Sequence, residues 1–595
     1  MTGVAPSGEY QRRIAALDQS IAALDRAHLR TSNLRLAAFG AAAVLAWLAF
    51  GRGGIGPWWV ALPVAAFLTL LVVHARLLNA RDRVWRARRY YERGLSRLDG
   101  TWVGSGADGA RFLDGHHLYA RDLDLFGRGS LFQLLNTTRT EAGEQTLADW
   151  LRTPAGADEV HARQRAVAEL RDRLDFRETL AVLAAEAHVS RSGLLARWAG
   201  TEPAGLGPTH AVLFAGCALV TALLVAAVAL DAASGAVLLW WLAVPASVAL
   251  WHKRRIWEVI RRVDAVAADL TLLADLLRVL EQASFEAPRL AVLRSALAGS
   301  RRPSDLMRQL GRFVAARDAL RNEFVRPFGL LLLVRSQAAV AIDRWHYKHR
   351  RSLQAWLTAI GEFEAFASLA THAYEHPSDI VPTIAHDGPV LDATGLGHPL
   401  IPEDTVVRND LGLGGSAPRL LLVSGSNMSG KSTLLRAVGA NVVLALAGGT
   451  VRATRLTLSP LAIGATMRIQ DSLEEGHSRF YSEILRIRDI VDLSRGPVPV
   501  LFLLDEILHG TNSHDRRIGA EAIVRTLVEA GGIGLVTTHD LALTALVATL
   551  GGRARNVHFE DRLEEGRMCF DYRMRDGVVE RSNALELMRA VGITV

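Results

Sequence analysis

The sequence predicts an α/β domain at the C-terminal end of a largely helical chain that also carries two membrane hairpins. Three observations lead to this prediction. Beyond about residue 386, short β-branched runs alternate with helical segments, as an α/β architecture requires. Within that region a glycine-containing stretch between a strand and a helix matches a phosphate-binding loop. Upstream, long uncharged apolar stretches occur in two closely spaced pairs.

The apolar stretches cover residues 36–50 and 58–73 in the first pair and 211–230 and 236–251 in the second. None contains an acidic or basic residue. A helix needs roughly 20 apolar residues to cross a bilayer core, with about 17 as the lower limit. The connections within the pairs are very short, so each pair predicts a helical hairpin that enters the membrane and returns. The alternative is two hairpins buried in a soluble core.

Flanking charges favour the membrane. Arginines cluster before the first hairpin and after both hairpins, whereas the two tips hold a single basic residue, Arg52. The positive-inside rule then places both chain ends and all large segments in the cytoplasm, with the hairpins in the cytoplasmic (inner) membrane. The mixed-charge leader before residue 36 does not resemble a signal peptide.

Periodicity and composition divide the chain into six segments. A further apolar run, residues 328–334, is too short to span and is expected to be a buried helix segment. The expected segments are an amphipathic leader (1–33), the first hairpin (34–75), a helical core (76–205), the second hairpin (206–252), long lever-like helices (253–385) and the α/β domain (386–595).

Charge and cysteine content give little support for a nucleic-acid-binding, disulfide-rich or metal-binding class of protein. The net charge is +7, and much of the positive excess flanks the apolar stretches, so it is weak evidence for nucleic acid. The two cysteines, Cys217 in a predicted span and Cys569 in a predicted strand, suggest neither a disulfide framework nor a metal site.

The stretch SGSNMSGKST fits the pattern G-x-x-x-x-G-K-[ST] without a gap. Its glycines let backbone N–H groups approach phosphates, and the positive end of the following helix adds to the attraction. Lys431 is expected to reach the outer phosphates of ATP, and the Ser432 hydroxyl to ligate Mg²⁺. The expected ATP-binding residues are Gly425, Ser426, Asn427, Met428, Ser429, Gly430, Lys431, Ser432 and Thr433.

Two later strands deliver candidate catalytic groups to the same sheet edge. The run VLFLLDE places Asp505 at the tip of a central strand, where it can hold Mg²⁺, and Glu506 beside it, where it can polarise the attacking water. The run IGLVTTHD delivers His539, which can sense the γ-phosphate or orient water. Together these residues predict an ATPase with a parallel sheet and its ligand at the strand ends.

Several motifs resemble the ATPase domain of the MutS family of mismatch-repair proteins. These are SGSNMSGKST, DSLEEGHSRFYSEI, LLDEILHGTNSHDR and TTHD, together with the C-terminal tail; SLFQLLNTTRTEAGEQTLADWLRTP resembles the start of the family's helical core. The resemblance implies a homodimer with two composite ATP sites. It also implies that Gly476, Ser478, Phe480 and Glu483 belong to a segment reaching toward the partner's nucleotide, with Ser478 near the γ-phosphate.

The sequence departs from the family in three loop positions and at its N-terminal end. Ser426, Ser429 and Arg479 stand where proline, glycine and threonine are usual, but these changes keep the backbone donors. The family's N-terminal mismatch reader, with its Phe-x-Glu wedge, is not expected here, because this end of the chain reads as a short leader and a membrane hairpin. The letters at Phe176 and Glu178 match the wedge, but they fall inside a helical segment and are not expected to read DNA.

One stretch, from Arg344 to Arg351, interleaves aromatic and basic residues and could contact DNA without sequence specificity. A solvated helix face is the favoured interpretation. The combined expectation is a membrane-anchored, MutS-like ATPase, with DNA binding left open. The alternatives are an ABC-type transporter half-molecule, for which no LSGGQ-like signature is found, and an ATP-driven remodeller of a membrane partner.

Overall fold

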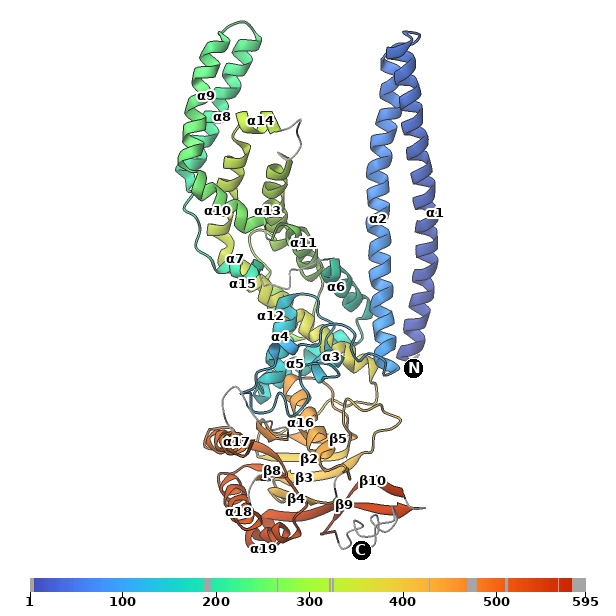
Figure 1. Ribbon diagram of the computed structural model, residues 1–595, viewed down its shortest axis with the longest axis vertical. Coiled ribbons are helices and arrows are strands. Elements are labelled where there is room, and N and C mark those ends of the chain that lie inside the picture. Colours follow the sequence, from blue (N-terminus) through green and yellow to red (C-terminus); the bar gives the residue numbers. More distant parts are fainter. Residues whose placement is uncertain are drawn as a thin grey trace.

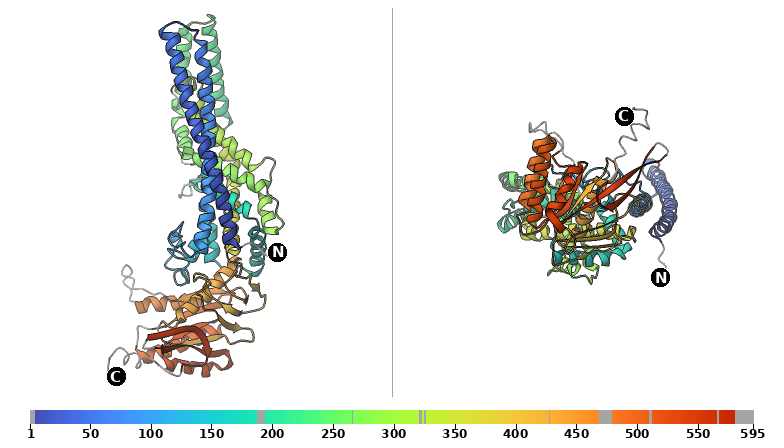
Figure 2. Two further views of the ribbon diagram at one scale, coloured as in Figure 1. Left: turned by 90° about the vertical axis from the view of Figure 1, so that its right-hand side faces the viewer. Right: turned by 90° about the horizontal axis from the view of Figure 1, so that it is seen from below.

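The computed structural model describes residues 5–579 except 187–193, 265, 320–322, 324–325, 427, 468–478, 509–511 and 565–566. The molecule is elongated, with an α/β domain at one end and helices extending from it to the other end (Figure 1). Two helical hairpins project from the helical part in the same direction and reach a similar height, as the side view in Figure 2 also shows.

The first hairpin consists of α1 (Pro6–Ala46), a short π-helix (Trp47–Gly51) and α2 (Trp58–Leu98). The expected leader and the first apolar stretch therefore form one continuous helix. Both long helices pass a length and apolarity test for membrane spans, and only 0% and 11% of their apolar windows are buried. At the other end of the hairpin, the lack of a side chain at Gly94 of α2 lets Tyr10 of α1 pack closely. A Cβ at this position would lie 2.3 Å from the Tyr10 ring.

The second hairpin consists of α8 (Pro208–Ala229) and α9 (Gly235–Trp251). Within the described residues three helices are long and apolar enough to cross a membrane, namely those of the first hairpin and α8. The 17-residue α9 is too short to qualify by itself. It is long and apolar enough only when it is counted together with α10 (Lys253–Asp264), from which it is bent by 62°. The number of helices that qualify is therefore three, or four if the bent pair is one span.

The helical body between the hairpins and the α/β domain is built around α15 (Val334–Glu375), a helix of 42 residues. Gly361 lets α4 approach α15, since a Cβ there would lie 2.7 Å from the Ala142 carbonyl oxygen. Phe176 lies in the same core, with its ring 5.5 Å from that of Phe285. The other helices of the body are α3 (Leu131–Leu135), α4 (Glu141–Arg152), α5 (Ala157–Arg171), α6 (Leu174–Glu186), α7 (Leu194–Gly200), α11 (Ala267–Gln282), α12 (Pro288–Ala296) and α13 (Pro303–Asp318).

The expectation of a buried helix at residues 328–334 is wrong. The segment forms α14 (Arg326–Leu331) and the start of α15, and the side chains of Phe328 and Leu330 are 68% and 61% exposed. In Figure 1 this helix lies at the height of the second hairpin, beyond the packed body. Leu333 near the end of the run is buried, at 8% exposure, but most of the run is not buried, so an apolar composition alone did not make it a core segment.

The α/β domain contains a six-stranded sheet in the order β10-β9-β4-β8-β7-β6, in which all neighbouring pairs are parallel except β10–β9. A four-stranded sheet, β1-β5-β2-β3, adjoins it. The strands are β1 (Thr383–Ile384), β2 (Val390–Leu396), β3 (Asn409–Gly414), β4 (Leu420–Ser424), β5 (Arg455–Leu458), β6 (Ala462–Thr466), β7 (Val500–Asp505), β8 (Ile533–Thr538), β9 (Ala554–Glu564) and β10 (Arg567–Asp576). The helices are α16 (Lys431–Ala447), α17 (Arg479–Leu493), α18 (Ser513–Glu529) and α19 (Leu546–Leu550).

The central strands are apolar throughout, as expected for a parallel sheet covered on both faces. All five residues of β4 and all six of β8 are buried. The register pairs Ser424 with Thr538 and Asp505 with Thr537. The carboxyl ends of β4, β7 and β8 therefore meet at one edge of the sheet, where the candidate site lies.

Candidate functional site

A tight loop connects the end of β4 to the first residue of α16, Lys431. Gly430, the residue before the helix, has a φ of +105°, and a Cβ there would lie 3.1 Å from the ring of Tyr572. Both the left-handed conformation and the close approach favour glycine at this position. The Ser429 hydroxyl donates a 2.9 Å hydrogen bond to the Ser426 carbonyl, so the serine that departs from the family pattern helps to shape the loop.

Lys431 is buried, and its ammonium group turns back over the loop. It donates hydrogen bonds of 2.8 Å and 2.7 Å to the carbonyl oxygens of Gly425 and Ser426. Its Nζ also lies 3.7 Å from Oε1 of Glu506. Burial lowers the pKa of Lys431, while Glu506 and Asp505 act in the opposite direction. The lysine is thus held by carbonyl groups and carboxylates that an anionic ligand could replace.

The two carboxylates after β7 are oriented by a residue that the sequence analysis did not single out. Thr537 on β8 donates a 2.5 Å hydrogen bond to Oδ1 of Asp505 and accepts one of 3.0 Å from the Glu506 backbone N–H. The Nδ1 of His539 lies 3.7 Å from Oε2 of Glu506. Glu506 therefore lies between Lys431 and His539, as the sequence predicted for residues at one sheet edge. The pairing of β7 with β8 was the signal that could have identified Thr537.

A cavity of about 500 Å³ adjoins the loop on the side of β3 and β10. Lys431, Ser432, Thr433 and Met428 line one part of it. The rest is lined largely by apolar and aromatic residues distant in sequence, among them Leu396, His398, Val406, Phe559 and Tyr572. Burial lowers the pKa of His398 to about 4, so its ring is neutral at physiological pH. The cavity therefore joins a polar end, lined by Lys431, Ser432 and Glu506, to an apolar end.

The residues implied to reach toward a partner subunit are only partly described. Of these, Gly476 and Ser478 lie outside the described residues, as does Asn427 of the expected ATP-binding loop. Phe480 packs against the core beneath α17 and α18. Glu483 is buried and accepts a 2.5 Å hydrogen bond from the Leu508 backbone N–H within its own domain. Glu483 therefore supports the turn after β7 in this arrangement.

The basic, aromatic stretch at 344–351 lies on α15 and is only partly available for contacts. Trp345 is buried and donates a hydrogen bond to the Leu306 carbonyl, and buried His346 bonds to the Trp198 carbonyl. Tyr347 is the exposed aromatic ring of the stretch, at 74% exposure. The stretch is therefore neither an open row of stacking rings nor a wholly solvated helix face.

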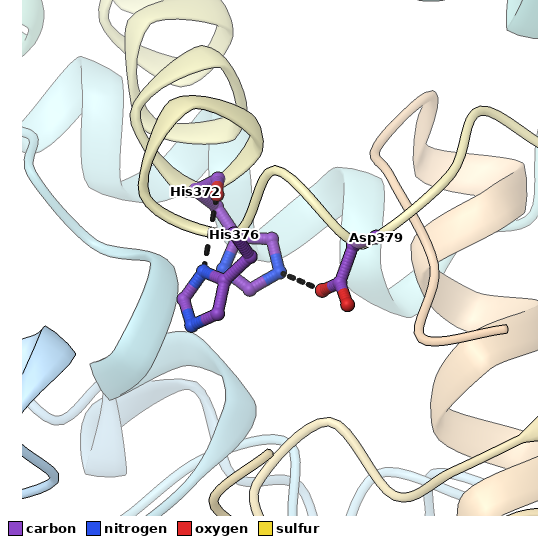
Figure 3. A group of neighbouring side chains, drawn as sticks. All are labelled: His372, His376 and Asp379. Carbon is purple, nitrogen blue, oxygen red and sulfur yellow. Dashed lines mark hydrogen bonds and ion pairs between the residues drawn. The ribbon is translucent and has the colours of Figure 1, made fainter. Parts of the chain in front are cut away.

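A cluster of His372, His376 and Asp379 lies where α15 ends and the chain enters the α/β domain (Figure 3). One potential ligand atom from each residue lies within 4.8 Å of the others. However, Arg452 donates a 3.1 Å hydrogen bond to Asp379, and Nδ1 of His376 contacts the His372 carbonyl at 3.1 Å. A cation here would face the Arg452 guanidinium, so the arrangement better fits a link between α15 and the α/β domain.

The fold and this residue set define an α/β domain whose parallel sheet gathers a lysine, two carboxylates and a histidine at one edge. Residues 421–594 match the family model of MutS domain V. Over 246 residues the chain is 32% identical to a protein named DNA mismatch repair protein MSH3 from Phaeosphaeria nodorum. It is 34% identical over 249 residues to a DNA mismatch repair protein MutS from Shouchella clausii, and 32% identical over 265 residues to one from Natronomonas pharaonis.

These similarities show that the C-terminal part of the chain carries a domain of the MutS type. The three alignments cover 40%, 41% and 44% of this chain, but only 22%, 28% and 29% of the relatives. The chain thus matches less than a third of the length of the curated relatives. The match to the family model includes the loop and the sheet edge described above, and the helical part lies outside it.

Proposed function

We propose that this protein is a membrane-anchored, MutS-like ATPase that changes conformation as it binds and hydrolyses ATP. The observation that carries the proposal is the position of Glu506, within 3.7 Å of both the Lys431 ammonium group and the His539 ring at the end of the loop. This arrangement combines a phosphate-binding cation with a carboxylate and a histidine able to handle a water molecule.

Each group has a defined role in the proposed reaction. Backbone N–H groups of the loop and the N-terminal end of α16 bind the phosphates, and Lys431 neutralises the outer ones. Ser432 and Asp505 would hold Mg²⁺, which neutralises charge on the β- and γ-phosphates when bound. Glu506 orients a water molecule and accepts its proton as the water oxygen attacks the γ-phosphorus. The bond to the bridging oxygen breaks, and ADP and phosphate leave.

The apolar end of the adjoining cavity suits the base of the nucleotide. The Tyr572 side chain is 44% exposed and lies beside the loop, where its ring closely approaches Gly430. Stacking on an aromatic ring is a common way to bind a nucleoside base. We propose that the site is completed by a second copy of the chain, as the family resemblance implies.

A series of buried polar contacts supports transmission from the site to the helices. Asn441 on α16 accepts a 2.8 Å hydrogen bond from the Arg452 backbone N–H, and the Arg452 side chain bonds to Asp379 at the end of α15. Glu375, the last residue of α15 and four positions before Asp379, accepts hydrogen bonds from Arg97 on α2. A movement of α16 can therefore reach both α15 and the first hairpin.

The proposed location is the cytoplasmic (inner) membrane, with the ATPase domain in the cytoplasm. Support comes from the two hairpins, which project the same way and expose apolar side chains such as Trp58 and Trp240, at 87% and 81%. The flanking arginines fit the positive-inside rule. A four-span topology requires α9 to cross as well, with the bend into α10 at the membrane surface.

The ATP-driven change in conformation has two candidate targets, DNA and a membrane-associated partner. Relatives named as mismatch repair proteins favour DNA binding over transport. The burial of Trp345 and His346 removes stacking groups from the candidate DNA surface and favours a membrane-associated partner instead. Any DNA contact would then be non-specific and depend on backbone phosphates.

The decisive experiment is an ATPase assay in nanodiscs without DNA and with matched, mismatched and branched duplexes at two salt concentrations. Glu506→Gln is the blank, and Glu529→Gln, an exposed carboxylate on α18, is the matched control. A wild-type rate no higher than that of Glu506→Gln contradicts the ATPase proposal. A DNA-dependent rate that weakens with salt identifies DNA as the output, and a rate that ignores every DNA identifies the membrane.

A further inference from the structure

A second large cavity lies far from the loop, between α2 and the segment that precedes α4. Its volume is about 1490 Å³. One wall is α2 from Arg81 to Arg93, a length of about 18 Å at the rise of an α-helix. The opposite wall consists of residues 106–111 with Thr138, Arg139 and Glu144. Nothing in the proposed ATPase cycle uses this cavity.

Arginine dominates the lining. Six arginines face three acidic residues; the arginines are Arg81, Arg86, Arg89, Arg93, Arg111 and Arg139, and the acids are Asp82, Asp108 and Glu144. Two of the acids already have a partner in or next to the lining. Glu144 forms a 2.8 Å ion pair with Arg111, and Asp108 accepts a hydrogen bond from the Ala110 backbone N–H. The cavity therefore has a marked excess of positive charge.

The excess is concentrated at the inner end, farther from the apolar stretch of α2, at exposed Arg89 and at half-buried Arg93 and Arg139. Arg89 and Arg93 are four residues apart on α2 and so lie on one helix face. Among the described residues no hydrogen bond or ion pair is formed by these three guanidinium groups. Burial lowers the pKa of Arg139 to about 10, and repulsion from Arg93 adds to this effect. Burial lowers the pKa of Arg93 as well, with Arg97 and Arg89 repelling it.

We propose that this cavity binds a phosphate-bearing ligand with at least two negative charges, held by Arg89, Arg93 and Arg139 if it is soluble and by Arg81 and Arg86 at the rim if it is a lipid headgroup. Three guanidinium groups without an ion pair or hydrogen bond of their own among the described residues exceed what a single carboxylate can neutralise, whereas one phosphate group carries about −1.5 to −2 at pH 7. The planar guanidinium fork also matches phosphate oxygens in a bidentate manner. The volume leaves room for an organic group attached to the phosphate.

Two sources could supply this chemistry, a soluble phosphorylated compound or the headgroup of an anionic lipid. If the apolar end of α2 lies in the membrane as proposed, Arg81 follows Val73 by about 12 Å and Arg93 by about 30 Å along the helix. A lipid headgroup would then reach the rim at Arg81 and Arg86. Only a soluble ligand would reach Arg93 and Arg139. Variants at the rim and at the inner end of the cavity therefore distinguish a lipid headgroup from a soluble ligand.

The test is the melting temperature of the full-length protein in nanodiscs, in a Lys431→Ala background that weakens phosphate binding at the loop. The soluble arm adds pyrophosphate to nanodiscs of neutral phosphatidylcholine, and the lipid arm replaces part of that lipid by phosphatidic acid, whose phosphomonoester can carry two negative charges. The inner variant is Arg93→Gln with Arg139→Gln, and the rim variant is Arg81→Gln with Arg86→Gln. Arg495→Gln, with its side chain 70% exposed on the α/β domain, is the control.

We expect pyrophosphate to raise the melting temperature, and the inner variant to weaken its apparent affinity about tenfold or more. If the headgroup is the source, phosphatidic acid raises the melting temperature and the rim variant abolishes that rise. Without ligand, the inner variant should melt no lower than its parent, because it removes repulsion. The proposal is overturned by the absence of a shift in both arms, by equal shifts in the cavity variants and the control, by stabilisation with duplex DNA alone, or by an inner variant that melts markedly lower without ligand.

Discussion

Arg97 near the end of α2 donates two hydrogen bonds, each 2.6 Å long, to the carboxylate of Glu375 near the end of α15. Glu375 also accepts a 3.1 Å hydrogen bond from the Tyr10 hydroxyl on α1. The Arg97 side chain is 10% exposed and that of Glu375 is fully buried. This bidentate pair joins the first hairpin to the long helix that enters the α/β domain.

Replacing one partner of this pair should destabilise the protein strongly. Arg97→Ala leaves the Glu375 carboxylate buried without its cation, and breaking a buried pair in this way costs about 3–5 kcal/mol. Denaturant unfolding in detergent measures the loss. Arg495→Ala breaks a surface pair with Asp492 and should cost at most about 1 kcal/mol. Equal effects of the two variants would show that the buried pair has no special role.

The stability of the helical body should depend on pH through Glu364. Burial raises the pKa of this carboxyl group from 4.5 to about 7, although it accepts hydrogen bonds from Thr140 and the Arg139 backbone N–H. Between about pH 4.5 and 7 the folded chain keeps a proton that the unfolded chain has released. The free energy of unfolding should therefore fall as the pH rises through this window, by up to about 3 kcal/mol.

Urea unfolding at pH 5 and pH 8 checks this expectation, with Glu364→Gln as the comparison. The amide does not titrate, so the variant should lose this part of the pH dependence while other groups keep theirs. The same pH dependence in wild type and variant would assign the effect to another group.

The loop conformation should be required for nucleotide binding. Gly430→Ala places a side chain at a φ of +105° and against Tyr572, and the left-handed conformation alone costs about 1–2 kcal/mol. We expect ATP affinity to fall about tenfold or more. Gly531→Ala imposes a similar conformation, at a φ of +91°, before β8, where the nearest atom is 3.6 Å away. Fluorescent ATP binding should be normal in this control, and a matching loss there would contradict the prediction.

The native cysteines provide a test of the proposed topology. Cys569 is exposed on β10 and Cys217 is buried in α8. A membrane-impermeant maleimide should label Cys569 in inverted membrane vesicles but not in intact cells, and should leave Cys217 unlabelled in both. A Ser234→Cys variant at the tip of the second hairpin should show the opposite pattern. Labelling of Cys569 from outside intact cells would rule out the proposed orientation.

Much of the candidate site could be predicted because its signals are local. A strand, a tight turn and a helix start are predicted within a few residues by the spacing of Gly425, Gly430 and Lys431. Strands with polar residues at their tips are predicted by the apolar runs that end at Asp505 and His539. In a parallel sheet such tips meet at one edge, so the register of β4, β7 and β8 brings them together. The hairpins are equally local, since an uncharged apolar run of sufficient length predicts a span by itself.

The sequence by itself therefore determined the α/β class of the C-terminal domain, its family and the residues at the sheet edge. The tertiary structure alone decided the contacts between distant segments. Tyr572 approaches a loop some 140 positions earlier, and Glu375 meets Tyr10 across 365 positions. It also decided that Trp345 is buried and Phe328 exposed. The physical reason is that burial and charge pairing depend on what packs from elsewhere in the chain, which no local pattern specifies.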